Sequence, residues 1–240
     1  MKGEYDLVTE ADRASEKLVV ERLGARFPSH SIVGEEGGGQ EGSSDYRWYV
    51  DPLDGTTNFA HGYPMFNVTL GLERSGEMVC GVIYDPLTKE MFAAERGSGA
   101  YLNNRRIHVS KAKSIEESLV STGFPSRRRH LGYNIHFYHQ LAMCTHGVRR
   151  GGSAALDLAF VACGRLDAFW EFGLNPWDMA AGLLMVEEAG GKISDMKGGP
   201  ASLRAPHIVA DNGTVHEEFL TLLREVFENR PRYPLPSISS

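Results

Sequence analysis

The sequence has few cysteines, no long apolar run and no surplus of positive charge. Its 240 residues include only three cysteines, and this odd, widely spaced set fits neither a disulfide framework nor a zinc site: Cys80, Cys144 and Cys163. No apolar stretch approaches the ~18 residues that a membrane-spanning helix needs. The first residues also lack the apolar segment of a secretory signal. We therefore expect a protein of the reducing cytoplasm with no membrane segment.

The charge balance is mildly acidic, with 25 Lys+Arg against 31 Asp+Glu and a formal net charge of −6. Nucleic-acid-binding proteins usually carry a basic surplus, so direct nucleic-acid binding is not expected. The 42% apolar and 23% charged residues are ordinary for a globular protein and exclude disordered, collagen-like and coiled-coil classes. A charge of −6 is compatible with simple solubility, or with clustered carboxylates that require cations. The positions of the acids distinguish these possibilities.

The apolar periodicity divides the chain into two parts. A helix over 9–26 begins with Thr9 and Asp12 in a capping-box pattern. Further strands are then expected before the middle of the chain, at 31–34, 47–50, 67–72, 78–84, 91–94 and 119–122. Helices and strands alternate afterwards, with helices at 129–145, 153–163, 177–189 and 215–227 and strands at 167–171, 192–194 and 208–210. We predict an α+β part over 1–135, an α/β part over 136–230 and a loose tail over 231–240.

The most informative segment is Asp51-Pro52-Leu53-Asp54-Gly55-Thr56. A proline turn after the 47–50 strand would bring its two aspartates within about 7 Å of each other. Carboxylate oxygens at one point suit Mg²⁺, and two ions sharing a carboxylate can clamp both oxygens of a phosphoryl transfer. A helix starting after Gly55 would direct free amides at a phosphate. Asp-Pro-x-Asp-Gly is also simply a good turn, but the full string arises by chance about once in 10⁶ to 10⁷ start positions.

Four motifs in this order and spacing resemble those of the inositol monophosphatase family of magnesium-dependent, lithium-sensitive phosphatases: DLVTEAD at 6–12, GEE at 34–36, DPLDGTTNF at 51–59 and WDMAAG at 177–182. The resemblance covers roughly residues 2–225. It implies a layered αβαβα sandwich of the sugar-phosphatase type, assembled as a homodimer. Family members usually carry helical sequence before the segment that starts here at Lys2, so the N-terminal helical cover is expected to be shortened.

The resemblance also implies the metal ligands. Glu35 and Asp51, with the backbone carbonyl of Leu53, would hold a first Mg²⁺ ion. Asp51, Asp54 and Asp178 would hold a second, and a weaker third ion would lie near Glu35. All of these groups are oxygen ligands, as Mg²⁺ prefers.

The same resemblance assigns the groups that act on water and substrate. Asp12 and Thr56 would position and activate the attacking water. Glu35 would contribute as a ligand of the first metal, which also holds that water. The backbone of Gly55 and Thr56 would receive the phosphate. Glu171 and the loop Gly152-Ser153-Ala154 would face the hydroxyl groups of the substrate.

Several of these residues have simpler interpretations. Glu35, before three glycines, suits a solvated loop. Asp178 near a helix start suits a cap, and Asp12 suits the third position of a capping box. Ser153 suits a helix N-cap, a role compatible with lining a pocket. Lys2 matches a family lysine near the water-binding loop or is an ordinary terminal lysine.

Two further groups carry weaker signals. Arg127, Arg128 and Arg129 form either a solvated basic surface or a grip on a second phosphate, since the guanidinium fork suits phosphate. His136 and His139 share a face of an expected helix, but no acid cluster or cysteine nearby supports zinc, so we interpret them as surface or pocket-lining residues.

The sequence therefore predicts a cytoplasmic, Mg²⁺-dependent phosphomonoesterase in which activated water attacks the phosphorus in line. Its expected substrate is inositol monophosphate or a similar polyol or sugar phosphate. Alternatives with the same chemistry are fructose 1,6-bisphosphate, a 3′-phosphoadenosine nucleotide and histidinol phosphate. An alternative of another class is a protein partner of the transcription machinery.

Overall fold

A large mixed sheet forms the first half of the chain. The computed structural model describes residues 8–124 and 132–235. Eight strands run in the order β2-β1-β3-β4-β5-β6-β7-β8. β1 pairs with β3 in parallel, and the other neighbours are antiparallel. The strands are β1 (Ser31–Gly34), β2 (Gly39–Gln40), β3 (Tyr46–Asp54), β4 (Asn67–Arg74), β5 (Glu77–Asp85), β6 (Glu90–Glu95), β7 (Gly99–Leu102) and β8 (Arg105–Ile107).

A smaller five-stranded sheet follows, in the order β10-β9-β11-β13-β12. β9 pairs in parallel with β10 and β11, whereas β13 is antiparallel to both of its neighbours. The strands are β9 (Leu119–Thr122), β10 (Gly147–Arg149), β11 (Ala168–Phe172), β12 (Lys192–Ser194) and β13 (His207–Asp211).

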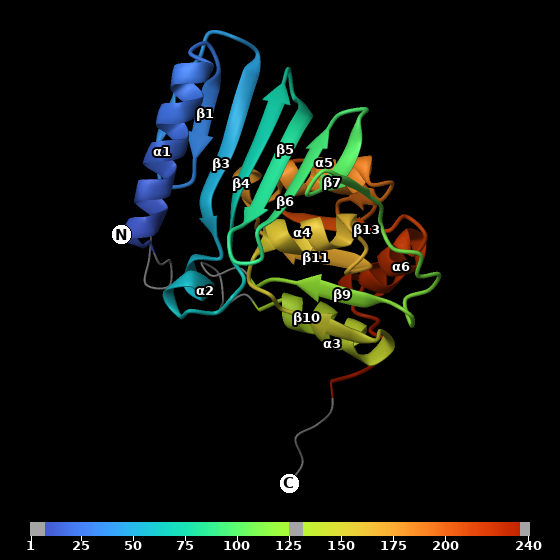
Figure 1. Ribbon diagram of the computed structural model, residues 1–240. Helices are drawn as coiled ribbons and strands as arrows, with labels where there is room; N and C mark the ends of the chain where they lie inside the picture. The colour runs from blue at the N-terminus through green and yellow to red at the C-terminus, as the bar shows by residue number, and fades with distance from the viewer. Residues whose placement is uncertain (1–7, 125–131, 236–240) are drawn as a thin grey trace.

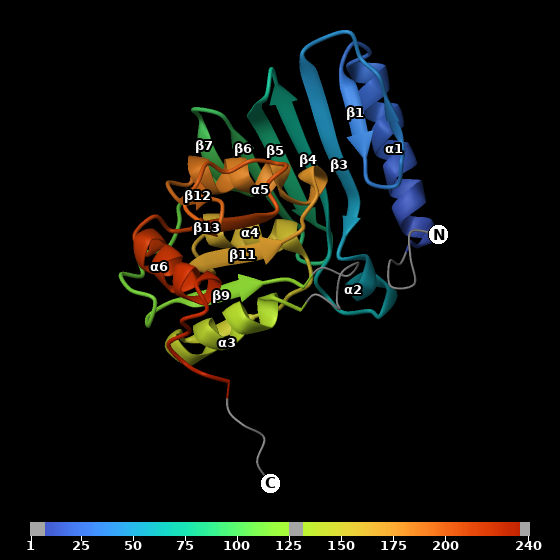
Figure 2. The same ribbon diagram turned by 180° about the vertical axis from the view of Figure 1, so that it is seen from behind.

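The helices form three layers around these sheets (Figures 1 and 2). α1 (Glu10–Arg26) covers β1 and β3 on the outer face of the large sheet, and α2 (Thr56–Ala60) is a single short helix after β3. α4 (Ala154–Ala162) and α5 (Pro176–Glu188) lie between the two sheets. α3 (Asn134–Cys144) and α6 (His216–Phe227) cover the far face of the small sheet. This layering confirms the predicted αβαβα sandwich.

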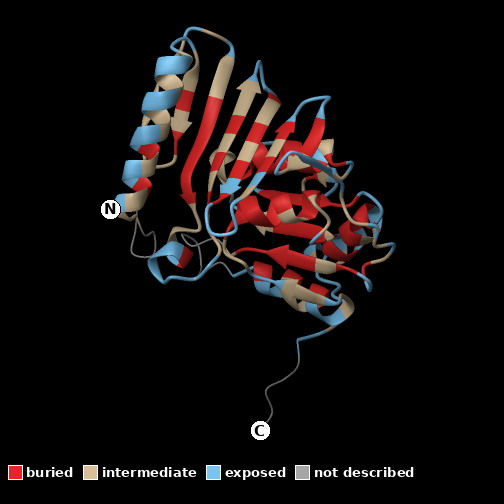
Figure 3. Ribbon diagram, in the orientation of Figure 1, coloured by how far each residue is buried: buried red, intermediate tan, exposed pale blue. Residues whose placement is uncertain are grey.

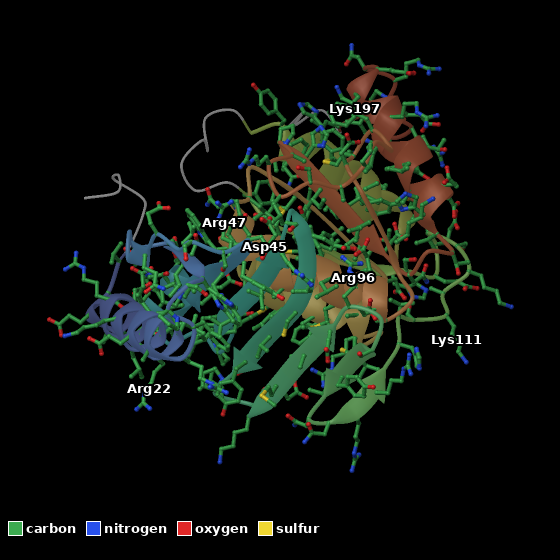
Figure 4. All side chains as sticks on the ribbon, turned by 90° about the horizontal axis from the view of Figure 1, so that it is seen from above. Arg22, Asp45, Arg47, Arg96, Lys111 and Lys197 are labelled. Atoms are coloured by element: carbon green, nitrogen blue, oxygen red, sulfur yellow. The ribbon has the colours of Figure 1, made fainter. Side chains whose placement is uncertain are left out.

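The core follows the layers. The largest apolar cluster joins the inner face of the large sheet to α4 and α5, and a second joins the small sheet to α3 and α6. Figure 3 shows this burial concentrated between the sheets, with exposed residues on the outer face of α1. Charged side chains point outward, among them Arg22 on α1 and Lys111 after β8 (Figure 4). α4 and α5 are apolar around most of their circumference because both lie between two sheets.

Local signals placed most helix ends correctly. Thr9 accepts hydrogen bonds from the backbone of α1, and its own amide donates to Asp12 Oδ2 over 2.8 Å, so the predicted capping box is confirmed. The helix expected over 129–145 is observed as α3, from Asn134 to Cys144. Four short strands were not predicted from the sequence: β2, β7, β8 and β10. β10, for example, has three residues and is held by its parallel pairing with β9. So short a segment has no periodicity of its own, and its existence depends on its partner strand.

The chain passes from the large sheet to the small one between Ile107 and Leu119. α5, from the second half of the chain, packs on β3 to β7 of the first. The two sheets therefore share their central layer, and the division at residue 135 stays a prediction.

Within the described ranges, no helix combines the length and apolar character needed to cross a membrane.

Candidate active site

The Asp51–Asp54 segment is extended, which corrects the predicted proline turn. β3 continues through Pro52 to Asp54 instead of stopping at Asp51. Its pairing with β4 shifts register between Asp51 and Asp54, which marks a bulge or irregularity. Because proline cannot donate to a ladder, it is tolerated where regular pairing is interrupted. The irregular pairing separates Asp51, opposite Thr69, from Asp54, opposite Asn67.

Four carboxylates lie near enough to one another around this bulge to interact unfavourably through their charges. Burial raises the pKa of Asp51 well above its usual range, and the charges of Asp54, Glu35 and Asp178 raise it further. Burial likewise raises the pKa of Asp54, and that of Asp178 to about 8. Asp51 is only 2% exposed. The structure thus places four of the predicted acids, from β3, α5 and the loop after β1, within electrostatic range of one another.

Hydrogen bonds hold one oxygen of each aspartate. Asp51 Oδ1 accepts from Leu53 N over 3.0 Å. Asp54 Oδ2 accepts from Ser153 Oγ over 2.6 Å, and Asp178 Oδ2 accepts from the amide of Asn175 over 2.7 Å. None of these three bonds uses the second oxygen of the same carboxylate.

These groups fit Mg²⁺ by their chemistry. They are hard oxygen donors, and their mutual repulsion would be relieved by a cation. Across residues 8–124 and 132–235, no three His, Cys, Asp or Glu side chains converge closely enough to form a ready-made metal cage.

Asp12 and Thr56 form a second pair beside the carboxylates. Thr56 Oγ1 lies 2.9 Å from Asp12 Oδ1 and 3.0 Å from the carbonyl of Leu53. Asp12 is fully buried, and its Oδ2 accepts from both the amide and the hydroxyl of Thr9. The capping box therefore fixes Asp12 in place, so its cap role and its place in the site coexist.

The loop that carries Glu35 is built around Glu16 of α1. The Glu16 carboxylate accepts from Glu36 N over 2.8 Å and from Gly38 N over 2.7 Å. A Cβ at Gly34 or Gly38 would collide with that carboxylate, which explains glycines on both sides of the acidic pair. Glu16 was not singled out from the sequence, although its four-residue spacing from Asp12 placed both acids on one face of α1.

α2 begins directly after Gly55, as predicted. Gly55 has φ 92°, and a Cβ there would lie 2.8 Å from the carbonyl of Met65, so glycine is required. α2 therefore starts directly after Asp54 and Gly55 and lies below the N-terminal end of α1 (Figure 1).

The loop at 152–154 joins the same region. Ser153 is the N-cap of α4, accepting from Leu156 N, and also donates to Asp54. Asn58 of α2 donates to the carbonyls of Met65 and Gly151 over 2.7 and 2.9 Å. Together these bonds tie the loop to β3 and α2.

Glu171 lies on β11, next to this loop. Burial raises its pKa well above the usual range, and Asp157 and Asp178 raise it further, while Arg150 opposes the shift. A Cβ at Gly123 would occupy the position of its carboxylate. Glu171 is therefore close enough to the carboxylate group to interact with it electrostatically.

Three buried polar residues near the site escaped the sequence reading: Asn58, Asn67 and Asp157. Asn58 lies inside the DPLDGTTNF motif, so its place in the string was the signal. Asp157 is the one polar residue in the apolar stretch of α4, a placement that requires hydrogen-bond partners. Asn67 alternates with the apolar Val68, Leu70 and Leu72 of β4, so the apolar pattern gave no signal that it is buried.

Two predicted groups fall outside the described residues: Lys2 and Arg127–Arg129. His136 and His139 line a cavity of about 660 Å³ between α3, α6 and the C-terminal segment, which confirms them as pocket-lining residues. Among the residues that the structure describes, none of the predicted metal-, phosphate- or substrate-binding residues lines that cavity. Gln140 there exchanges hydrogen bonds with the backbone of Tyr233, which fixes the start of the expected loose tail.

Comparison with known proteins agrees with this geometry. The model of the inositol monophosphatase family matches residues 1–228. An inositol-1-monophosphatase of Rhizobium meliloti is 45% identical over 99% of this chain and 87% of its own length. The Nus factor SuhB of Pseudomonas aeruginosa is 49% identical over 93% of this chain and 84% of its own.

A solved structure of inositol monophosphatase from Anabaena (Nostoc) superposes with a TM-score of 0.87. The two chains are 45% identical, and the match covers 93% of this chain and 88% of the other.

Proposed function

Since the chain belongs to the inositol monophosphatase family and is a phosphatase, we propose that it hydrolyses inositol monophosphate, or a similar polyol or sugar phosphate, with Mg²⁺. The observation that supports this most is the group of mutually repelling carboxylates beside the Asp12–Thr56 pair. Repelling carboxylates need a cation, and a threonine bonded to a buried carboxylate suits the handling of a water proton.

Two ions would share the carboxylates. Glu35, Asp51 and the carbonyl of Leu53 would hold the first, and Asp51, Asp54 and Asp178 the second, with a weaker third ion near Glu35. When bound, Mg²⁺ supplies positive charge to the phosphate oxygens and to the leaving oxygen, and polarises water. The protein's part is to fix the carboxylates with one oxygen of each turned outward.

Asp12 and Thr56 would act on the attacking water. Thr56 Oγ1 can accept a hydrogen bond from water while donating its own proton to Asp12 Oδ1, 2.9 Å away. Asp12 cannot rotate, because Thr9 holds its other oxygen. The pair would thus direct the water's lone pair at phosphorus and pass one water proton through Thr56 to Asp12 as the new P–O bond forms. The P–O bond to the alcohol then breaks, and the departing alkoxide oxygen takes a proton from solvent water.

The amides of Gly55 and Thr56 would hold the phosphate, and Glu171 with the 152–154 loop would face the hydroxyl groups of the alcohol. A buried carboxylate such as Glu171 suits an alcohol with adjacent hydroxyls, which can donate to both of its oxygens. We also infer that the chain is cytoplasmic and forms a homodimer. Light scattering of the purified chain would check the dimer.

A phosphate-release screen tests the proposal. The chelator-treated chain is assayed on inositol monophosphate, fructose 1,6-bisphosphate, a 3′-phosphoadenosine nucleotide and histidinol phosphate, with Mg²⁺, without it, and with Li⁺ added. We expect release from inositol monophosphate that requires Mg²⁺ and is inhibited by Li⁺. Release that is unaffected by a chelator would contradict the proposal.

The screen also addresses the arginine run. If Arg127–Arg129 hold a second phosphate, replacing them with alanine should reduce activity on bisphosphates more than on inositol monophosphate. Equal losses on both would exclude that role.

A second candidate function is binding to the transcription machinery, which the name of the relative Nus factor SuhB supports. Its test is binding of purified RNA polymerase to the wild-type chain and to Asp54→Asn. Equal binding by both would separate a partner role from catalysis, and no binding would exclude the direct contact.

A further inference from the structure

Asn67 is a fully buried polar residue next to the carboxylates. It is the first residue of β4 and pairs directly with Asp54 of β3. Asn67, Thr69 and Gly71 alternate along the buried face of β4, where a Cβ at Gly71 would meet Ala180 of α5. A buried amide at such a position costs free energy unless its donors and acceptor are all bonded.

The hydrogen bonds of this amide have one consistent direction. Thr69 Oγ1 donates to Asn67 Oδ1 over 2.9 Å, so Nδ2 faces Asp54. Nδ2 donates to Asp54 Oδ2 over 3.0 Å and to Ser153 Oγ over 2.8 Å. Reversing the amide would place its oxygen against the carboxylate, which is repulsive.

Ser153 closes the network. Its single proton is donated to Asp54 Oδ2 over 2.6 Å, so its oxygen is the acceptor toward Asn67. The amide of Ala155 adds a further bond to Oδ2 over 2.9 Å. Three donors therefore converge on Oδ2 of Asp54, and none of these bonds uses Oδ1.

We propose that Asn67 is a positioning residue that turns Oδ1 of Asp54 toward the divalent cation. The inference rests on the proposed function, because Asp54 is a cation ligand only there. A carboxylate held at one oxygen loses less rotational freedom when the other binds a metal. Removing such outer partners typically weakens metal binding about 10- to 100-fold.

A structural role is the competing explanation, because Asn67 also connects β4 to the start of α4. Enzyme activity alone would not separate the two roles. The affinity for metal, measured without substrate, does so.

The experiment is a calorimetric titration of the chelator-treated full chain with Mn²⁺, which reports both sites. Asn67→Leu keeps a similar volume without the donor. We expect its Kd for Mn²⁺ to rise about tenfold or more at one site, while the other site keeps its affinity. At saturating Mg²⁺, kcat should recover and KM for substrate should stay unchanged.

Asn212→Leu is the matched control. Asn212 is also buried, and its Nδ2 donates to Ser110 Oγ and the carbonyl of Ala112 over 3.0 and 2.9 Å. It should lower the melting temperature without changing Mn²⁺ affinity. Thr69→Val, which removes only the hydroxyl that orients the amide, provides a milder variant and should raise the Kd in the same direction.

If the folded Asn67→Leu and Thr69→Val variants both bind Mn²⁺ with wild-type affinity, this inference is wrong, but the proposed function is unaffected. A wild-type chain that binds no Mn²⁺ and releases no phosphate would overturn the proposed function, and this inference with it.

Discussion

Thr56 shows how one hydroxyl connects the first helix to the site. It lies within hydrogen-bond distance of Asp12 on α1 and of the carbonyl of Leu53 on β3. A hydroxyl can donate one proton and accept from water at once. In the proposed mechanism, the Thr56 hydroxyl passes a proton of the attacking water to Asp12.

Thr56→Val should therefore remove proton handling while keeping the shape of the side chain. We expect kcat on inositol monophosphate to fall about 10²- to 10⁴-fold, the usual contribution of general acid–base catalysis. Mn²⁺ affinity should change little. Steady-state assays with calorimetry measure both quantities, and Thr57→Val, at an exposed neighbouring position, is the matched control. Equal activity in the two variants would remove Thr56 from the mechanism.

At the level of single residues, the motif strings predicted much of the site. Asp51, Asp54 and Asp178 do interact electrostatically, and Ser153 is indeed a helix cap near them. Asn67 was not predictable, because nothing in β4 marks a polar residue as bonded to Asp54. Its role depends on a contact with Ser153, 86 residues away.

The elements fit together through close approaches of backbone. Gly81 of β5 faces α5, where a Cβ would lie 2.8 Å from the Cα of Ala181 and 2.9 Å from its carbonyl oxygen. Gly71, its neighbour on β4, meets Ala180 in the same way. The position of α5, and with it Asp178, depends on these glycines.

Gly81→Ala should therefore destabilise the fold. We expect a loss of about 1–3 kcal/mol in the free energy of unfolding, as for overpacked cores, measured by urea denaturation. Gly24→Ala is the control. Gly24 lies within α1, where a Cβ would meet the side-chain amide of Gln40 but no backbone atom, so the same substitution should cost less there. A stable Gly81→Ala would show that α5 can shift away from the sheet.

Local sequence patterns predicted the helices and strands better than they predicted where a strand continues through an irregular segment. The capping box of α1 and the alternation in β4 and β5 are local properties, and both were readable. The course of β3 through Pro52 was not, because proline normally ends a strand. It continues here because its residues find partners on β4 on both sides of the irregularity.

At the scale of the whole molecule, the layer between the two sheets contains a buried acidic residue, Asp157. Burial raises the pKa of Asp157 on α4 well above its usual range, the charge of Asp54 adds to this, and Arg150 opposes it. A carboxyl with a raised pKa keeps its proton in the folded state after the unfolded chain has lost it. The folded state then binds more protons, so stability falls as pH rises above about 4.

Asp157→Asn should remove its share of that pH dependence. In the presence of a chelator, we expect the free energy of unfolding of the variant to improve relative to wild type between pH 5 and pH 8. The difference can reach about 1.4 kcal/mol per pH unit while only the folded form holds the proton. Urea denaturation at three pH values measures it, and parallel curves for the two proteins would contradict the assignment.

The central claim is that the carboxylates around Asp54 form the Mg²⁺-dependent phosphatase site, and Asp54→Asn tests it most directly. The substitution keeps the size of the side chain and removes its charge. Phosphate release from inositol monophosphate is measured against Mg²⁺ concentration, with circular dichroism as the check on folding. We predict a folded variant with no Mg²⁺-dependent phosphate release; a folded variant with full wild-type activity would contradict the account.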